Sequence, residues 1–229
     1  MLSALLAALD QLRMNRAIRV VVLAGAGRAF CADHDLREMR AHLDKAWLTE
    51  LFTQCSKLML TIVDIAQPVI ACIYGLATAA GCQLVAACDL AIASRSSRFT
   101  TNGVNLDLFC STPAVAIAGS VAPKRAAELL FGGDFITAEQ AERWGLVNRC
   151  VAEPALAQAT RDWAQAIAAK SGAAIMSGKT LLRKQRNLSL ADAYAVAGEN
   201  TAHDMLTENA NMGIDAFLNK QLLSEWTHR

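Results

Sequence analysis

The sequence predicts an α/β fold in which a core of buried parallel strands and covering helices is followed by a region made of helices alone. Short, apolar, β-branched segments alternate with amphipathic segments up to about residue 150, an order typical of a parallel sheet. From Glu153 onward every segment has helical periodicity. The 229 residues are enough for one large domain, or for one domain with a helical annex. We therefore divide the chain into a core at residues 1–152 and a helical region at residues 153–229.

The first part of the core alternates helices with buried strands. The opening stretch MLSALLAALDQL, residues 1–12, has the spacing of an amphipathic helix. AIRVVVLAGAG, residues 17–27, is a β-branched run that ends in glycines, which indicates a buried parallel strand and a turn. The expected elements that follow are a helix start over 36–42, a helix over 46–65, a strand over 67–75 with Pro68 at its entry, a short helix over 79–87 and a strand over 88–94.

The second part of the core has clearer end signals. Residues 97–113 mix polar and apolar side chains with turn formers, so we expect an ordered loop with short strands. Residues 122–133 predict a helix closed by glycines. Thr137 and Gln140 have the spacing of a capping box for a helix that stops at Gly145. Residues 146–151 predict the last strand.

The charge balance argues against nucleic acid and anionic membranes as partners. Twenty-two basic and 21 acidic side chains leave a net charge of +1, so no basic footprint indicates nucleic acid or an anionic membrane. No apolar run reaches the roughly 18 residues of a membrane-spanning helix. The mean hydropathy of +0.26 is nevertheless high for a soluble monomer. We expect the excess apolar surface to lie at contacts between subunits of an oligomer.

Seven cysteines occur at irregular spacings with no C-x-x-C pair. Most lie in apolar stretches, where cysteine acts as a small core residue. This usage predicts a reducing compartment, the cytoplasm or, in a eukaryote, the mitochondrial matrix, without a disulfide framework or a metal site. No secretory or transit signal is visible. Because the chain opens directly in a helix, we expect Met1 to be an internal methionine preceded by a strand or hairpin.

The stretch GAGRAFCADHDLREM, from Gly25 to Met39, has two interpretations. A G-x-G after a strand occurs in dinucleotide-binding sites, but Phe30 stands where the third glycine would be. The alternative is a turn whose backbone groups face a ligand, with Asp33 and Asp35 bracing it.

The stretch GLATAAGCQLVAACDLAIAS, from Gly75 to Ser94, offers a related arrangement. Its small residues would let the N-terminus of a helix approach a ligand, and the free amides of that first turn favour negative charge. One amide from each of the two turns would form an oxyanion hole. Small residues also permit tight packing of a helix on a sheet, and the spacing alone does not separate the two interpretations.

These stretches, with ITAEQAERWGLVNRCV and GIDAFLNK, resemble the enoyl-CoA hydratase/isomerase (crotonase) superfamily from residue 1 to about residue 226. GLATAAGCQLVA and GVNLDLFCSTP carry a narrower likeness to one group within it. The resemblance implies a spiral of ββα turns and a C-terminal helical region that builds trimers or hexamers. It also implies acyl-CoA thioester ligands, with coenzyme A as part of the substrate and no permanently bound cofactor.

The resemblance implies roles for individual residues. The oxyanion amides fall on His34 and Ala80, and the family's glycine before the first of them is Asp33 here. Contacts with the adenine and ribose side of CoA fall on Ala32, Leu36 and Arg37, and contacts from a neighbouring subunit fall on Phe217 and Lys220. The family's strand and loop ahead of residue 1, which also touch CoA, are absent from this sequence. The thioester and acyl group would lie against Ala32, His34, Asp35, Leu36, Ala79, Ala80, Gln83, Asn102, Gly103, Leu106 and Ser111.

The two glutamates that handle water and proton in the hydratases of the family are both replaced, by Gln83 and, on an ungapped comparison, by Gly103. An amide can orient water but cannot take its proton. We therefore expect weak hydratase activity from a chain that keeps the oxyanion hole. A non-catalytic acyl-CoA binder, another reaction of the family (isomerase, thioesterase or decarboxylase) and a nucleotide-dependent oxidoreductase are the alternatives.

Other polar side chains are assigned mainly structural roles. We expect the His34 side chain to face solvent or CoA, with proton transfer as the alternative. Cys31 and Cys110 are interpreted as packing residues, because no basic partner is evident for a nucleophile. We expect surface positions for His42, His203 and His228.

Overall fold

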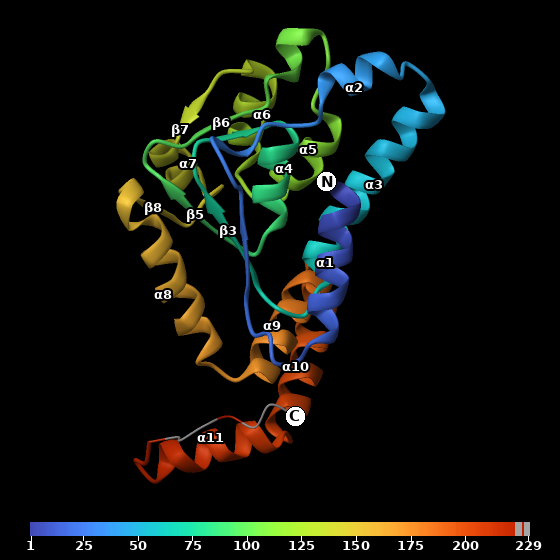
Figure 1. Ribbon diagram of the computed structural model, residues 1–229. Helices are drawn as coiled ribbons and strands as arrows, with labels where there is room; N and C mark the ends of the chain where they lie inside the picture. The colour runs from blue at the N-terminus through green and yellow to red at the C-terminus, as the bar shows by residue number, and fades with distance from the viewer. Residues whose placement is uncertain (223–225, 227–229) are drawn as a thin grey trace.

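The computed structural model describes residues 1–222 and 226, and these contain two four-stranded sheets (Figure 1). In the first sheet the strand order is β1-β3-β5-β8 and every neighbouring pair is parallel. The second has the order β2-β4-β6-β7 and is parallel except for its last pair. The strands are β1 (Val21–Ala24), β2 (Ala29–Cys31), β3 (Val69–Ile73), β4 (Leu76–Thr78), β5 (Leu90–Ser94), β6 (Arg98–Thr100), β7 (Ile136–Thr137) and β8 (Arg149–Val151).

Helices follow each pair of strands. In chain order, β1 and β2 precede α2 and α3, β3 and β4 precede α4, and β5 and β6 precede α5 and α6, so each turn of the chain adds one strand to each sheet. The helices are α1 (Leu2–Met14), α2 (Leu36–Ala41), α3 (Lys45–Asp64), α4 (Ala80–Ala87), α5 (Ser111–Ala118), α6 (Pro123–Gly132), α7 (Ala138–Trp144), α8 (Leu156–Ala168), α9 (Gly172–Lys184), α10 (Leu190–Met205) and α11 (Glu208–Leu218), with short 3₁₀ helices η1 (Asn102–Leu106), η2 (Glu153–Ala155) and η3 (Gln185–Asn187). The predicted ββα spiral with a C-terminal helical region is confirmed.

Strand β3 shows how the first sheet is covered on both faces. Val69, Ala71 and Ile73 are fully buried in the main core, which includes residues of α1, α3 and α4. Ile70 points the other way and packs with Leu156 of α8 in a second cluster. Side chains alternate between the faces of a strand, so an unbroken apolar run is the pattern of a strand buried on both sides.

The expected helices are found within one or two residues of their predicted ends. The capping box of α7 makes both of its bonds, since the Thr137 hydroxyl accepts from the Gln140 amide and the Gln140 side chain accepts from the Thr137 amide. The sequence did not predict the three-residue strands β2 and β4, because segments this short carry no periodicity. It also missed α5, which begins where a loop was expected: Pro113 lies in the first turn of α5, where proline is tolerated.

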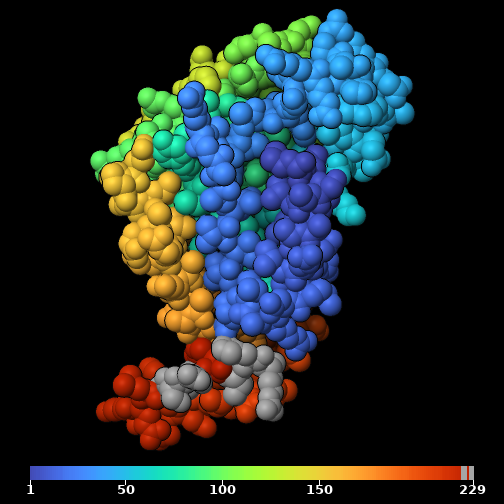
Figure 2. All heavy atoms as spheres, in the orientation of Figure 1, coloured from blue at the N-terminus to red at the C-terminus, as the bar shows by residue number. Residues whose placement is uncertain are grey.

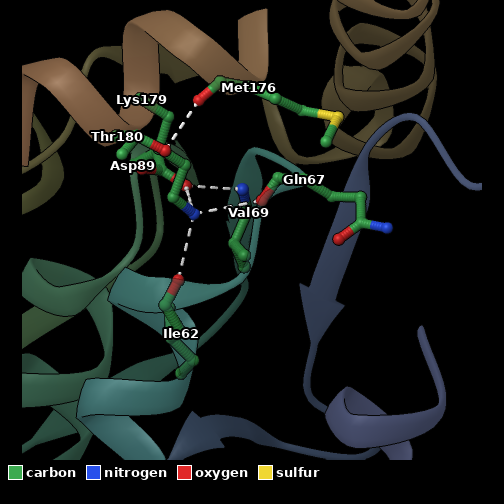
Figure 3. Close-up of polar contacts among 7 residues, drawn as sticks. All are labelled: Ile62, Gln67, Val69, Asp89, Met176, Lys179 and Thr180. Carbon is green, nitrogen blue, oxygen red and sulfur yellow. Dashed lines mark hydrogen bonds and ion pairs between the residues drawn. The ribbon is translucent and has the colours of Figure 1, made fainter. Parts of the chain in front are cut away.

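Lys179 of α9 attaches the C-terminal helices to the core (Figure 3). Its ammonium group donates to the carbonyl oxygens of Ile62 and Gln67, each at 3.0 Å, and to the Asp89 carboxylate at 2.7 Å. The same Asp89 oxygen accepts from the Val69 amide at 2.7 Å, at the start of β3. One buried cation therefore joins α9 to the end of α3, to the entry of β3 and to the segment before β5.

The last helix, α11, lies below the rest of the described chain (Figure 2). It follows α10 and is far from α2, α4 and α5 at the opposite end of the molecule (Figure 1). Among the described residues, no helix has the length and apolar character needed to cross a bilayer.

Candidate active site

Two turns meet at one edge of the second sheet. Because β2 and β4 are parallel neighbours, the turn after β2 and the turn after β4 lie at the same edge. The contact between them is a hydrogen bond in which the Ala80 amide donates to Oδ1 of Asp33 at 3.1 Å. The structure thus brings together the two turns that the sequence singled out.

Both turns contain a non-glycine residue with positive φ. Asp33 has φ 84°, and Ala79, the residue before α4, has φ 42°. Such conformations cost on the order of 1–3 kcal/mol each and concentrate at functional sites. The backbone at this edge is therefore held in place by the surrounding packing.

Helix α4 starts at this edge without a side-chain cap, and almost all of its residues are buried. Gly81 lies in its first turn, where an added Cβ would come within 2.3 Å of the Cys31 carbonyl oxygen. Glycine is therefore required for α4 to lie against β2. The small residues serve close packing at this position, and the same packing places the Ala80 amide at the turn after β2.

Gln83 lies one turn into α4 and is 4% exposed. Its Oε1 atom is 3.9 Å from Sγ of Cys55 on α3, a weak donor. The long polar side chain in the middle of the small-residue stretch is thus a buried neutral amide.

Gly103 lies in η1 with no space for a side chain. An added Cβ would be 2.5 Å from the Leu108 carbonyl oxygen and 2.8 Å from Sγ of Cys110. The clash with backbone cannot be relieved by a change of rotamer. A glutamate at this position would need the segment from Gly103 to Cys110 to follow another path.

Four cysteines lie in the elements around this edge: Cys31, Cys55, Cys82 and Cys110. Burial raises the pKa of all four thiols, to about 11 for Cys55 and about 12 for Cys82, and the negative charge of Asp33 adds to the rise in each. Cys82 also donates to the Ala77 carbonyl oxygen at 3.0 Å. Thiols with raised pKa values are protonated at neutral pH, which argues against a nucleophilic role and agrees with packing.

The structure bears on the expectation that the His34 side chain faces solvent or CoA. Its Nε2 atom is buried and has no hydrogen-bond partner among the described residues, so this atom does not face solvent. The ring lies perpendicular to Phe52 of α3, with 5.5 Å between centroids. The ring contact shows that the His34 side chain is directed toward α3.

The other predicted contact residues are divided between the two ends of the molecule. Asp35 caps α2 by accepting from the amides of Arg37 at 2.8 Å and Glu38 at 3.3 Å, as expected of a bracing residue. Ala32, Leu36 and Arg37 are exposed beside it, and Asn102, Leu106 and Ser111 lie on η1 and at the start of α5. Phe217, 82% exposed, is in the last turn of α11, and Lys220 lies just beyond this helix, which is far from the two turns within one chain (Figure 1). His42 and His203 are exposed, and His228 is outside the described residues.

The sequence assigned Asp33 only a bracing role. Its carboxylate in fact accepts a hydrogen bond from the backbone amide of Ala80, 47 residues further along the chain. The available signal was the replacement of a glycine by an aspartate, but the partner of that aspartate depends on the fold. Among the described residues, no group of three or more histidine, cysteine, aspartate or glutamate side chains could hold a metal ion.

The family model for enoyl-CoA hydratase/isomerase matches residues 1–229. The human enoyl-CoA hydratase domain-containing protein 3, mitochondrial, is 40% identical over 211 residues, which are 92% of this chain and 69% of the relative. The crystal structure of an enoyl-CoA hydratase from Mycobacterium smegmatis has a TM-score of 0.96 and 46% identity, and the match covers 99% of this chain and 88% of that one. The human domain-containing protein 3 structure has a TM-score of 0.89 and 39% identity over 95% of this chain and 88% of its own. These matches confirm both the broad resemblance and the narrower one.

Proposed function

Because the chain belongs to the enoyl-CoA hydratase/isomerase family, we propose that it binds acyl-CoA thioesters at the edge where the turns after β2 and β4 meet, and that it hydrates enoyl-CoA poorly. In this proposal the thioester oxygen accepts from the amides of His34 and Ala80. Two such donors stabilise the negative charge of an enolate, and one of them is typically worth about 10²–10³ in rate.

The buried amide of Gln83 carries the second half of the proposal. At 4% exposure it lies among neutral groups, with the Cys55 thiol nearest its oxygen. A carboxamide is not basic near neutral pH, so it cannot remove a proton from the attacking water. Gly103 has no side chain, and the Leu108 carbonyl leaves no room for one. Neither of these two positions, where the hydratases of the family would hold an acid/base group, therefore carries such a group.

The remaining contacts follow from the same placement. Ala32, Leu36 and Arg37 are proposed to contact the adenine and ribose side of CoA. Phe217 lies in α11 and Lys220 just after it, at the opposite end of the molecule from the two turns (Figure 1), so they are proposed to reach CoA from a neighbouring subunit of a trimer or hexamer. The human relative is named mitochondrial, and we propose the mitochondrial matrix for a eukaryotic source and the cytoplasm otherwise.

The test is hydration of crotonyl-CoA by the wild type and by Gln83→Glu, with Gln83→Met as the matched control. We expect slow hydration by the wild type, because a positioned acid/base group usually contributes about 10²–10⁴-fold. Gln83→Glu has nearly the same shape and restores one such group, so its rate should rise by about 10-fold or more, whereas Gln83→Met should show no gain. Thermal melting checks that each variant folds. A wild type that hydrates crotonyl-CoA as fast as an ordinary hydratase would contradict the proposal.

A further inference from the structure

The amide proposed to bind the thioester oxygen already has a partner inside the protein. The Ala80 N–H donates to Oδ1 of Asp33 at 3.1 Å, within the range of a normal hydrogen bond. Ala80 is the first residue of α4, where backbone amides have no partner within the helix. A carboxylate is a stronger acceptor for such an amide than a neutral carbonyl oxygen is.

The backbone of Asp33 is held in a conformation that favours glycine. Its φ of 84° is in the left-handed region, which non-glycine residues rarely adopt. Glycine at this position would adopt the same turn without strain and would leave the Ala80 amide without the carboxylate. The aspartate therefore adds a specific contact to a turn that does not need it for its geometry.

The charge of Asp33 is directed into the site rather than away from it. Asp33 is only half-buried, yet its negative charge acts on the thiols of Cys55, Cys82 and Cys110, which come from three other segments of the chain. The N-terminus of α4 also favours a negative charge at this point. Position and charge together make the carboxylate resemble the oxyanion that the site is expected to stabilise.

We propose that Asp33 is an internal competitor for the thioester oxygen, occupying the Ala80 amide in the free protein and leaving it only when an acyl-CoA displaces it. This rests on the function proposed above. Since the competition concerns the carbonyl group alone, Asp33 weakens binding of the thioester while leaving contacts with the rest of CoA unchanged. It also opposes enolate formation, because the displaced carboxylate remains beside the developing negative charge.

The test compares two ligands that differ only in the carbonyl group. Butyryl-CoA carries a thioester, and S-butyl-CoA is the thioether without the carbonyl oxygen. Dissociation constants are measured by calorimetry for the full wild-type chain, Asp33→Gly and Asp33→Asn. Asp33→Gly removes the competitor and the positive-φ strain, while Asp33→Asn keeps the shape and removes the charge. Asp107→Gly is the matched control, since Asp107 is an exposed aspartate with φ 59° that does not contact Ala80.

We expect the preference for thioester over thioether to rise by about 10-fold in Asp33→Gly, by less in Asp33→Asn and not at all in Asp107→Gly. A purely structural role for Asp33 would change melting temperature, or both affinities together, and would leave the preference unchanged; that outcome overturns the proposal. A preference that falls in Asp33→Gly also overturns it, because Asp33 would then support thioester binding. If neither the wild type nor an Asp33 variant binds either ligand, the proposed function itself fails.

Discussion

Replacing Lys179 by methionine should destabilise the fold strongly while leaving its shape nearly unchanged. Lys179 is 9% exposed in its side chain, and its ammonium makes three contacts, with the Ile62 and Gln67 carbonyls and with Asp89 (Figure 3). Methionine fills a similar volume but donates no hydrogen bond. The variant therefore leaves the Asp89 carboxylate without its cation and two carbonyl oxygens without their donor.

The size of the effect follows from burial. Removing one partner of a buried ion pair typically costs about 3–5 kcal/mol, because the charge of the other partner is left uncompensated. Asp89 is 28% exposed and keeps the Val69 amide as a donor, so water and this amide partly screen it and the lower end applies. A loss of about 3 kcal/mol in a domain of this size lowers the melting temperature by about 6–12 °C.

The matched control lies one helical turn further along α9. Arg183 pairs with Asp64, but the two side chains are 50% and 46% exposed, and such pairs are worth about 0–1 kcal/mol. Arg183→Met should therefore change the free energy of unfolding by under about 1 kcal/mol. Urea denaturation and calorimetry of both variants measure the difference. Equal losses in the two variants, or a small loss in Lys179→Met, would refute the argument from burial.

Three further predictions test other parts of the structure. Gly103→Ala should destabilise by about 1–3 kcal/mol in thermal melting because its Cβ meets the Leu108 backbone, whereas Gly178→Ala, which meets nothing within 4 Å, should be neutral or stabilising; similar melting temperatures would contradict the clash. Burial raises the pKa of Cys82 to about 12 from an ordinary 9.0, so the folded state holds its proton more tightly and the free energy of unfolding should fall as the pH rises above 9. Urea unfolding at pH 8 and pH 10 should show a smaller fall for Cys82→Ala than for the wild type, and equal falls would contradict this assignment. Light scattering should give a molar mass three or six times the 24.5 kDa mass of one chain. The mass of a monomer at micromolar concentration would exclude the proposed trimer or hexamer.

Much of the fold could be predicted from local patterns. The unbroken apolar run of β3 predicted a strand covered on both faces, and the structure places Ile70 and Val69 on opposite sides of the sheet. The Thr137 and Gln140 spacing predicted a cap that makes both of its bonds. The small residues around Gln83 predicted a short helix that either packs tightly on the sheet or approaches a ligand, and the structure shows the tight packing. These features depend on periodicity and on residues a few positions apart, so they are visible in one segment at a time.

The details of the site depend on segments that are distant in the sequence. The bond from Ala80 to Asp33 exists because β2 and β4 are parallel neighbours, and the missing space at Gly103 exists because Leu108 and Cys110 fold back onto it. The buried Nε2 atom of His34 likewise depends on the position of α3. The sequence by itself determined which residue types stand in the two turns, and it carries the expectation that the usual carboxylates are replaced. Only the tertiary structure decided which atoms meet, because contacts between distant segments are set by the path of the whole chain and by excluded volume, which no local pattern records.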